Sequence, residues 1–303
     1  MAEIAETIAE DIQLALDQDN LELPALPEVA LRIREVAESE FVSAISLGKV
    51  VAEDPGLSAQ LVRIANSPMF RATRSIDDLT MAISRLGVDY AANLVTGLAM
   101  QHMFQATSEL IDRRMRQVWK SSTTVAAWSS ILCNRFTKLG ADQAMLAGLT
   151  HCIGILPILS WAEENDDVVR DSITLDNVID AIHPSIGAMI LKHWNFSDDV
   201  TKVPENYQDL GYETATADYV DIVCAANLFS LMDTEESIAD QDWADCGALG
   251  RIGVSPHIDP LVFFAMREEV ANIASVLAER MGNYFTAVQA PSATAYQSFK
   301  SGW

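Results

Sequence analysis

His151 and Cys152 are adjacent, and each carries a side chain that binds transition metals. Imidazole and thiolate are ligands of zinc, and His183 offers a third donor for such a site. Adjacent residues of a helix point about 100° apart, however, so both side chains reach one ion only where the helix is distorted. We therefore favour a buried histidine bonded to a neighbouring helix, beside a cysteine that fills the core. A redox sensor at Cys152 would need a lowered thiol pKa.

Three further polar residues are expected on later helices. His183 precedes Pro184, a pair that predicts the start of a helix. Asp221 is expected to be a solvated or capping carboxylate. Asn227 falls in the middle of the apolar stripe of the same helix, so we expect it to point inward and to fix how the helices pack.

Helical periodicity predicts the elements that must position these residues. Apolar residues recur every four positions from Ile4 to Leu16, which indicates an amphipathic first helix. Pro27 is expected in the first turn of the next helix, and the pairs Asp54-Pro55 and Asp259-Pro260 predict helix starts. Ser75 is a predicted cap for the segment 77–86. Glycines 87 and 140 are predicted to end helices, the second after a long helix over 115–139.

The fold class predicted from this pattern is all-α, a two-lobed helical bundle, because no segment shows the alternation of a half-buried strand. A polar stretch at 105–114 separates two apolar blocks. We place an N-terminal helical bundle at 1–107, a second bundle at 108–289 and a C-terminal tail at 290–303. Residues 201–213 and 233–258 are expected to be long connections. The first helix and the tail are candidate docking elements.

Composition narrows the function. The formal net charge of −23 disfavours direct binding to nucleic acid or to anionic lipid, and it favours solubility or a basic partner surface. No apolar run approaches the ~18 residues of a membrane span, and the N-terminus lacks a signal-peptide pattern, so we expect a cytoplasmic protein. The four scattered cysteines predict buried, reduced thiols.

Several short motifs, taken in order, resemble the HDOD family, a group of bacterial signalling output domains related to the HD superfamily of metal-dependent phosphohydrolases. They are Leu23-Pro24-Ala-Leu-Pro27, Asp54-Pro55-Gly-Leu-Ser58, Asn66-Ser67-Pro-Met-Phe70, Leu86-Gly87, Trp119-Lys-Ser121-Ser122, Ala226-Asn227 and the segment 249–256. The resemblance covers about residues 21–285. It implies an N-terminal bundle followed by a degenerate HD-type helical bundle.

The resemblance also implies where the superfamily's metal ligands would lie. Ser121 stands at the position of the first histidine, and Cys152 replaces the aspartate of the His-Asp doublet. His151 remains, with His183 and Asp221 as possible neighbours. One imidazole and one distant carboxylate make a poor divalent site, so we expect no bound metal, no other cofactor and no catalytic residue.

The resulting expectation is a non-catalytic module of bacterial signal transduction that acts through protein partners. A groove between the lobes is a further expectation, with room for a partner helix or an unknown small ligand. The alternative is a metal-dependent phosphohydrolase with substituted ligands, which predicts bound metal and turnover that depends on His151. A nucleotide-sensing pocket without catalysis is a third possibility.

Overall fold

A computed structural model describes residues 14, 23–67, 70, 74–165, 172–232, 246–255 and 258–278. Every regular element within these ranges is a helix and none is a strand, which confirms the predicted all-α class. The predicted C-terminal tail and, apart from residue 14, the predicted first helix lie outside the described residues.

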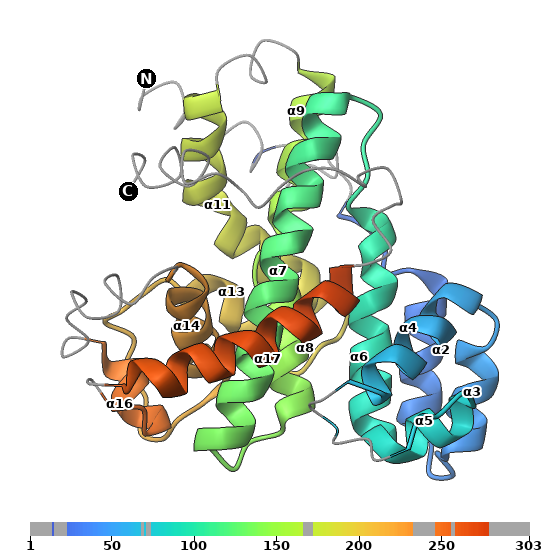
Figure 1. Cartoon of the computed structure of the whole chain (residues 1–303). Coiled ribbons are helices and arrows are strands. Elements are labelled where there is room, and N and C mark those ends of the chain that lie inside the picture. Colours follow the sequence, from blue (N-terminus) through green and yellow to red (C-terminus); the bar gives the residue numbers. More distant parts are fainter. Residues whose placement is uncertain are drawn as a thin grey trace.

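The N-terminal lobe consists of short helices that pack around a common core (Figure 1). Its helices are α2 (Glu28–Ala37), α3 (Ala44–Val51), α4 (Pro55–Ala65), α5 (Leu79–Leu86) and α6 (Val88–Ala99), followed by the 3-10 helix η2 (Met100–Met103). α2 packs on α3 and α6, and α4 packs on α5.

The second lobe is built around α7 (Glu109–Phe136), which is 28 residues long. The remaining helices are α8 (Ala141–Thr150), α9 (Ile155–Glu164), α11 (Ser172–His193), α12 (Asp198–Thr201), α13 (Val203–Asn206), α14 (Tyr219–Ser230), α16 (Gly247–Ile252) and α17 (Pro260–Ala278). α8, α14 and α17 pack directly on α7, and α17 crosses it obliquely (Figure 1).

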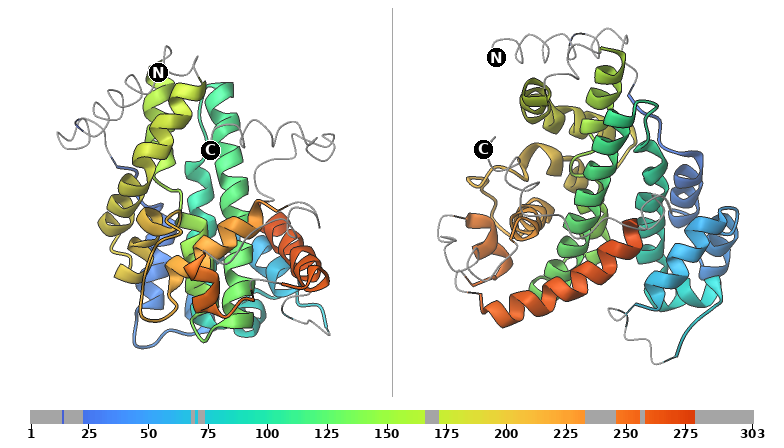
Figure 2. Two further views of the ribbon diagram at one scale, coloured as in Figure 1. Left: turned by 90° about the vertical axis from the view of Figure 1, so that its left-hand side faces the viewer. Right: turned by 45° about the horizontal axis from the view of Figure 1, so that its top comes forward.

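The two lobes share contacts at more than one place. α6 packs on α8, and the far end of α17 reaches α4 in the N-terminal lobe (Figure 2). Under α17, the ring of Trp128 lies 5.2 Å from that of Phe263 and 5.3 Å from that of Phe229. These large buried rings join α7, α14 and α17 within the second lobe.

The predicted Asp-Pro helix starts are confirmed. Asp54 Oδ1 accepts hydrogen bonds from the amides of Gly56 and Leu57 at 2.8 and 3.1 Å, with Pro55 at the first helical position. Asp259 Oδ1 accepts a bond from the amide of Leu261 at 2.8 Å. In both pairs the carboxylate accepts hydrogen bonds from first-turn amides, which have no backbone acceptor within the helix.

The other predicted helix boundaries have mixed outcomes: those at Ser75 and Gly140 are wrong, and that at Gly87 is confirmed. Asp78, not Ser75, caps α5, because its carboxylate accepts a bond from the amide of Met81. Gly87 does end α5, with φ of 91°. α7 ends at Phe136, where Thr137 turns to extended backbone, and Gly140 precedes α8 with an ordinary negative φ. The two predicted long connections contain the short helices α13 and α16.

One stretch of the core is long and strongly apolar. Ala141–Glu164, which comprises α8 and α9, is long and apolar enough to cross a membrane, with a mean hydropathy of 1.6. However, 83% of that window is buried inside the protein, as is typical of a core helix.

Candidate functional site

His151 and His183 come together in the core, where α8 ends and α11 passes. Their exposed fractions are 3% and 2%. Nδ1 of His151 donates to the carbonyl of Gly148, and Nδ1 of His183 donates to that of Ile179, each at 2.7 Å. Because a carbonyl only accepts, each ring carries its proton on Nδ1.

Tyr207 completes this cluster from the residue after α13. Its hydroxyl donates to Nε2 of His183 at 3.1 Å and accepts a bond from Nε2 of Gln208 at 2.9 Å. Its ring also lies 4.8 Å from that of His151, almost perpendicular to it. The sequence analysis missed Tyr207, because a four-residue helix gives no periodic signal. We refer to His151, Cys152, His183 and Tyr207 as the histidine centre.

Burial keeps the histidine centre uncharged. Loss of solvent lowers the pKa of both His151 and His183 to about 4. It raises the pKa of the Cys152 thiol to about 11 and lifts that of Tyr207 well above its usual value. At pH 7 the cluster therefore holds two neutral imidazoles, a thiol and a phenol. The raised pKa of Cys152 argues against a redox sensor there.

The neighbour of Cys152 on α7 is Ser122, the residue after Ser121. Ser122 is fully buried and its Oγ lies 3.0 Å from Cys152 Sγ, while Ser121 is exposed. The Ser122 hydroxyl donates to the carbonyl of Val118, so the cysteine thiol is the donor to Ser122. A one-residue step turns a helical side chain by about 100°, so Ser122 faces Cys152 and Ser121 faces solvent.

His183 lies in the middle of α11, with Pro184 inside the helix, so its predicted place at a helix start is wrong. Packing against other helices keeps α11 continuous through Pro184. The start of α9 meets α11 here, and a Cβ on Gly154 would stand 2.0 Å from the carbonyl oxygen of His183. Gly187 faces the same contact, its own Cβ position being 3.4 Å from the amide of Gly154. The two glycines allow the close approach that buries His183.

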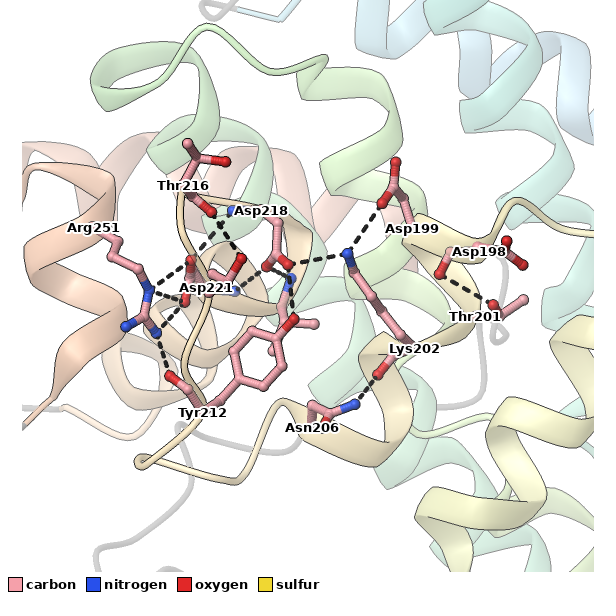
Figure 3. A network of polar contacts seen from close by, with 12 residues as sticks. Asp198, Asp199, Thr201, Lys202, Asn206, Tyr212, Thr216, Asp218, Asp221 and Arg251 are labelled. Carbon is pink, nitrogen blue, oxygen red and sulfur yellow. Dashed lines mark hydrogen bonds and ion pairs between the residues drawn. The ribbon is translucent and has the colours of Figure 1, made fainter.

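Asp221 belongs to a different cluster (Figure 3). It is fully buried on α14 and forms an ion pair with Arg251 of α16, whose Nε and Nη2 lie 3.0 and 2.6 Å from Oδ1. Asp221 Oδ2 also accepts the amide of Asp218, in a capping box at the start of α14. The capping part of the prediction is thus confirmed and the solvated part is wrong.

The same cluster extends toward solvent through Lys202 and Tyr212. Lys202 Nζ lies 3.0 Å from both Asp199 and Asp218, and the Tyr212 hydroxyl donates to Asp218 at 2.9 Å (Figure 3). Arg251 also donates to the carbonyl of Tyr212. We call the set Lys202, Tyr212, Asp218, Asp221 and Arg251 the ionic network.

The N-terminal motif residues have structural roles. Asn66 closes the loop before α5, since its amide donates to the carbonyl of Ile76 at 2.7 Å and its Oδ1 accepts the Ile76 amide at 2.8 Å. Ser67 is buried beside it. The carbonyl of Pro24 accepts the indole N–H of Trp194, and Pro27 immediately precedes α2, so the proline segment ties the N-terminal lobe to the end of α11.

Two other motif residues lie on α7 and α14. Trp119 is buried, and its ring lies 5.1 Å from that of Phe104, across the junction of the lobes. Asn227 is only partly buried, so the predicted inward position is wrong. The inward face of α14 is instead occupied by Val223, Ala226 and Phe229.

The residues do not fit the metal that the HD superfamily binds. His183 Nε2 is bonded to Tyr207, Asp221 is bonded to Arg251, and Ser122 and Cys152 are bonded to each other. In the part of the chain that the structure describes, no group of three or more His, Cys, Asp or Glu side chains is placed to hold an ion. The arrangement is that of a packed core, in which neutral polar contacts surround the histidines and an ion pair holds Asp221.

This combination of an all-helical, two-lobed fold and a buried histidine centre is that of an HD-related helical protein. The family model of the HDOD domain matches residues 23–210. The chain belongs to the HDOD domain family.

Known proteins agree in fold. A crystal structure from Shewanella amazonensis, named as a candidate metal-dependent phosphohydrolase, is 26% identical with a TM-score of 0.78, covering 91% of this chain and 99% of that one. A candidate signal transduction protein from Marinobacter aquaeolei is 21% identical with a TM-score of 0.55, covering 86% and 61%. An uncharacterized protein of Treponema pallidum is 24% identical over 213 residues, which are 62% of this chain and 40% of that protein's length.

Proposed function

We propose that this chain is a non-catalytic signalling or regulatory module that acts by contact with other proteins. The observation that carries this proposal is the histidine centre, in which the groups at HD-type positions are substituted, neutral or bonded to protein partners. Hydrolysis of a phosphate ester by this superfamily needs a metal that activates water, and these groups offer no open set of ligands for one. The cytoplasm is the compartment we assign to it.

Exposed apolar side chains of the N-terminal lobe support a role in protein contact. Phe41, Ile45 and Met81 have exposed fractions of 87%, 63% and 58%. Ile45 and Met81 lie on α3 and α5, two helices that pack against each other, and Phe41 lies just before α3. Large apolar groups on adjacent elements are typical of binding surfaces, and the acidic charge of the chain disfavours a nucleic acid there.

Metal content decides between this proposal and a phosphohydrolase. The untagged protein is incubated with manganese, iron and zinc, freed of loosely bound ions and measured by mass spectrometry. We expect less than about 0.1 equivalent of any metal and no turnover of a phosphodiester. Near one equivalent that is lost in His151→Ala, together with turnover, would establish a metal-dependent phosphohydrolase instead.

Protein contact is tested by cross-linking in cells. We expect specific cross-linked proteins with the wild type and their loss in the double variant Phe41→Ser, Ile45→Ser. Leu261→Ser is the matched control, because Leu261 is a 76%-exposed apolar residue on α17. Equal cross-linking by all three proteins would contradict a binding surface on the N-terminal lobe.

A further inference from the structure

Cys224 and Cys246 are two thiols that neither the histidine centre nor the ionic network uses. Cys224 lies on α14, one turn after Asp221, and Cys246 immediately precedes α16. Their exposed fractions are 2% and 8%, which makes Cys246 the most exposed cysteine of the chain. α14 and α16 pack against each other, which brings these two thiols within reach of each other, whereas Cys133 and Cys152 contact hydroxyl groups.

The two thiols differ in acidity. The hydrogen bond from Cys224 lowers the pKa of Cys246, and the amides of Leu249 and Ala248 and the charge of Arg251 add to the effect. The same hydrogen bond, together with burial, raises the pKa of Cys224. Because the thiolate is the nucleophile in thiol chemistry, Cys246 is the sulfur that reacts first.

Packing also places this pair at a structural junction. Arg251 passes over the first turn of α16, since a Cβ on Gly247 would stand 2.8 Å from its Nη1. Arg251 then reaches Asp221 on α14. The thiol pair and the buried ion pair therefore connect the same two helices, α14 and α16.

We propose that Cys224 and Cys246 form a redox-sensitive dithiol that closes to a disulfide when the protein meets a hydroperoxide. The Cys246 thiolate attacks the peroxide, the O–O bond breaks, and a sulfenic acid and hydroxide (or alkoxide) form. The Cys224 thiol then attacks the sulfenic sulfur, and the S–O bond breaks. The departing hydroxide takes the thiol proton and leaves as water, so two thiols are oxidised by two electrons and one peroxide is reduced.

The disulfide would reinforce the contact that the ion pair makes. It closes the loop formed by residues 225–245, which restricts the unfolded chain and stabilises the folded one. Reduction by a small thiol reverses the step. Peroxide would thus set how firmly α16 is held to α14, a property independent of the contacts assigned to the N-terminal lobe.

The test is peptide mapping of the full chain after treatment with about one equivalent of hydrogen peroxide. We expect a cross-linked peptide containing Cys224 and Cys246, and loss of two of the four thiols in a count on denatured protein. The melting temperature should rise by roughly 5 °C and fall back after addition of dithiothreitol. The double variant Cys133→Ser, Cys152→Ser is the matched control and should cross-link like the wild type, whereas Cys246→Ser should not.

Several outcomes would overturn the proposal. They are a cross-link between other cysteines, oxidation of Cys246 to sulfinic acid without a cross-link, no loss of thiols, and a cross-link that leaves the melting temperature unchanged. The peptide map of the wild type decides the matter even if a serine variant fails to fold. Alkylation at pH 7 adds a second measurement, in which Cys246 should react before the other three cysteines.

Discussion

The histidine centre and the ionic network stabilise buried polar groups in opposite ways. Both bury polar groups that the sequence predicted at or near the degenerate HD-type ligand positions. In the histidine centre burial removes the charge, since the pKa values of both imidazoles fall to about 4. In the ionic network the fully buried carboxylate of Asp221 is held by a two-pronged contact with the Arg251 guanidinium. The comparison indicates that a buried polar group is stabilised either as a neutral core group or as half of an ion pair.

Replacing Arg251 should cause the largest loss of stability. Arg251→Ala leaves Asp221 buried without a counter-charge, and we expect a loss of about 3–5 kcal/mol in the free energy of unfolding. Urea denaturation measures it. Arg113→Ala is the control, because Arg113 pairs with Glu109 on the surface and should cost less than about 1 kcal/mol. An equal, small loss in both variants would mean that Asp221 is not dependent on its partner.

Lowering the pH should destabilise the protein through the two histidines of the histidine centre. His151 and His183 have pKa values of about 4 when folded and about 6.5 when unfolded, so the unfolded chain binds more protons between these values. Stability is therefore full above pH 6.5 and is lost as the pH falls toward 4. At pH 5 each histidine should cost about 2 kcal/mol relative to pH 7.

The measurement is urea denaturation at pH 7 and pH 5 of the wild type and of His183→Gln. The variant should lose about 2 kcal/mol less than the wild type on acidification. An identical loss in both proteins would show that His183 is protonated as readily in the folded state as in the unfolded one.

The sequence predicted the helices, and part of the site, for identifiable reasons. The predicted helix starts at Asp54-Pro55 and Asp259-Pro260 are confirmed, because helix capping depends only on residues a few positions apart. His183-Pro184 failed as a helix start because the packing of Gly154 on α11, a contact between residues about thirty positions apart, keeps the helix continuous. Local rules cannot include such a contact.

For the same reason, the sequence did not predict the partners of the site residues. Tyr207 and Arg251 follow or lie on short helices without periodic patterns, yet they supply the hydrogen-bond and ion-pair partners of His183 and Asp221. The contact of Ser122 with Cys152 could not be predicted, because a motif match fixes a segment and not the rotation of each side chain. A buried acidic residue near a helix start is the one signal that could have prompted a search for a basic partner.

Two tyrosines offer a smaller contrast between the regions. Tyr207→Phe removes the hydroxyl that donates to His183 Nε2 and leaves a buried acceptor without a partner, so we expect a loss of about 1–3 kcal/mol. Tyr212→Phe removes a bond to Asp218 at the more open side of the ionic network and should cost less than about 1 kcal/mol. Thermal denaturation of the two variants compares them directly. The reverse order would contradict the greater burial of the histidine centre.

The smallest expected effect separates the two ends of the ionic network. The Lys202 side chain is 34% exposed, whereas that of Arg251 is 20% exposed and faces a carboxylate with no exposure. Lys202→Ala should therefore cost only about 0.5–1 kcal/mol, and the loss should shrink in about 0.5 M sodium chloride, because salt screens exposed charges more than buried ones. Urea denaturation of Lys202→Ala and Arg251→Ala at low and high salt measures both effects. If the two variants respond equally to salt, the network is uniformly exposed to solvent, and the distinction between its buried and open ends fails.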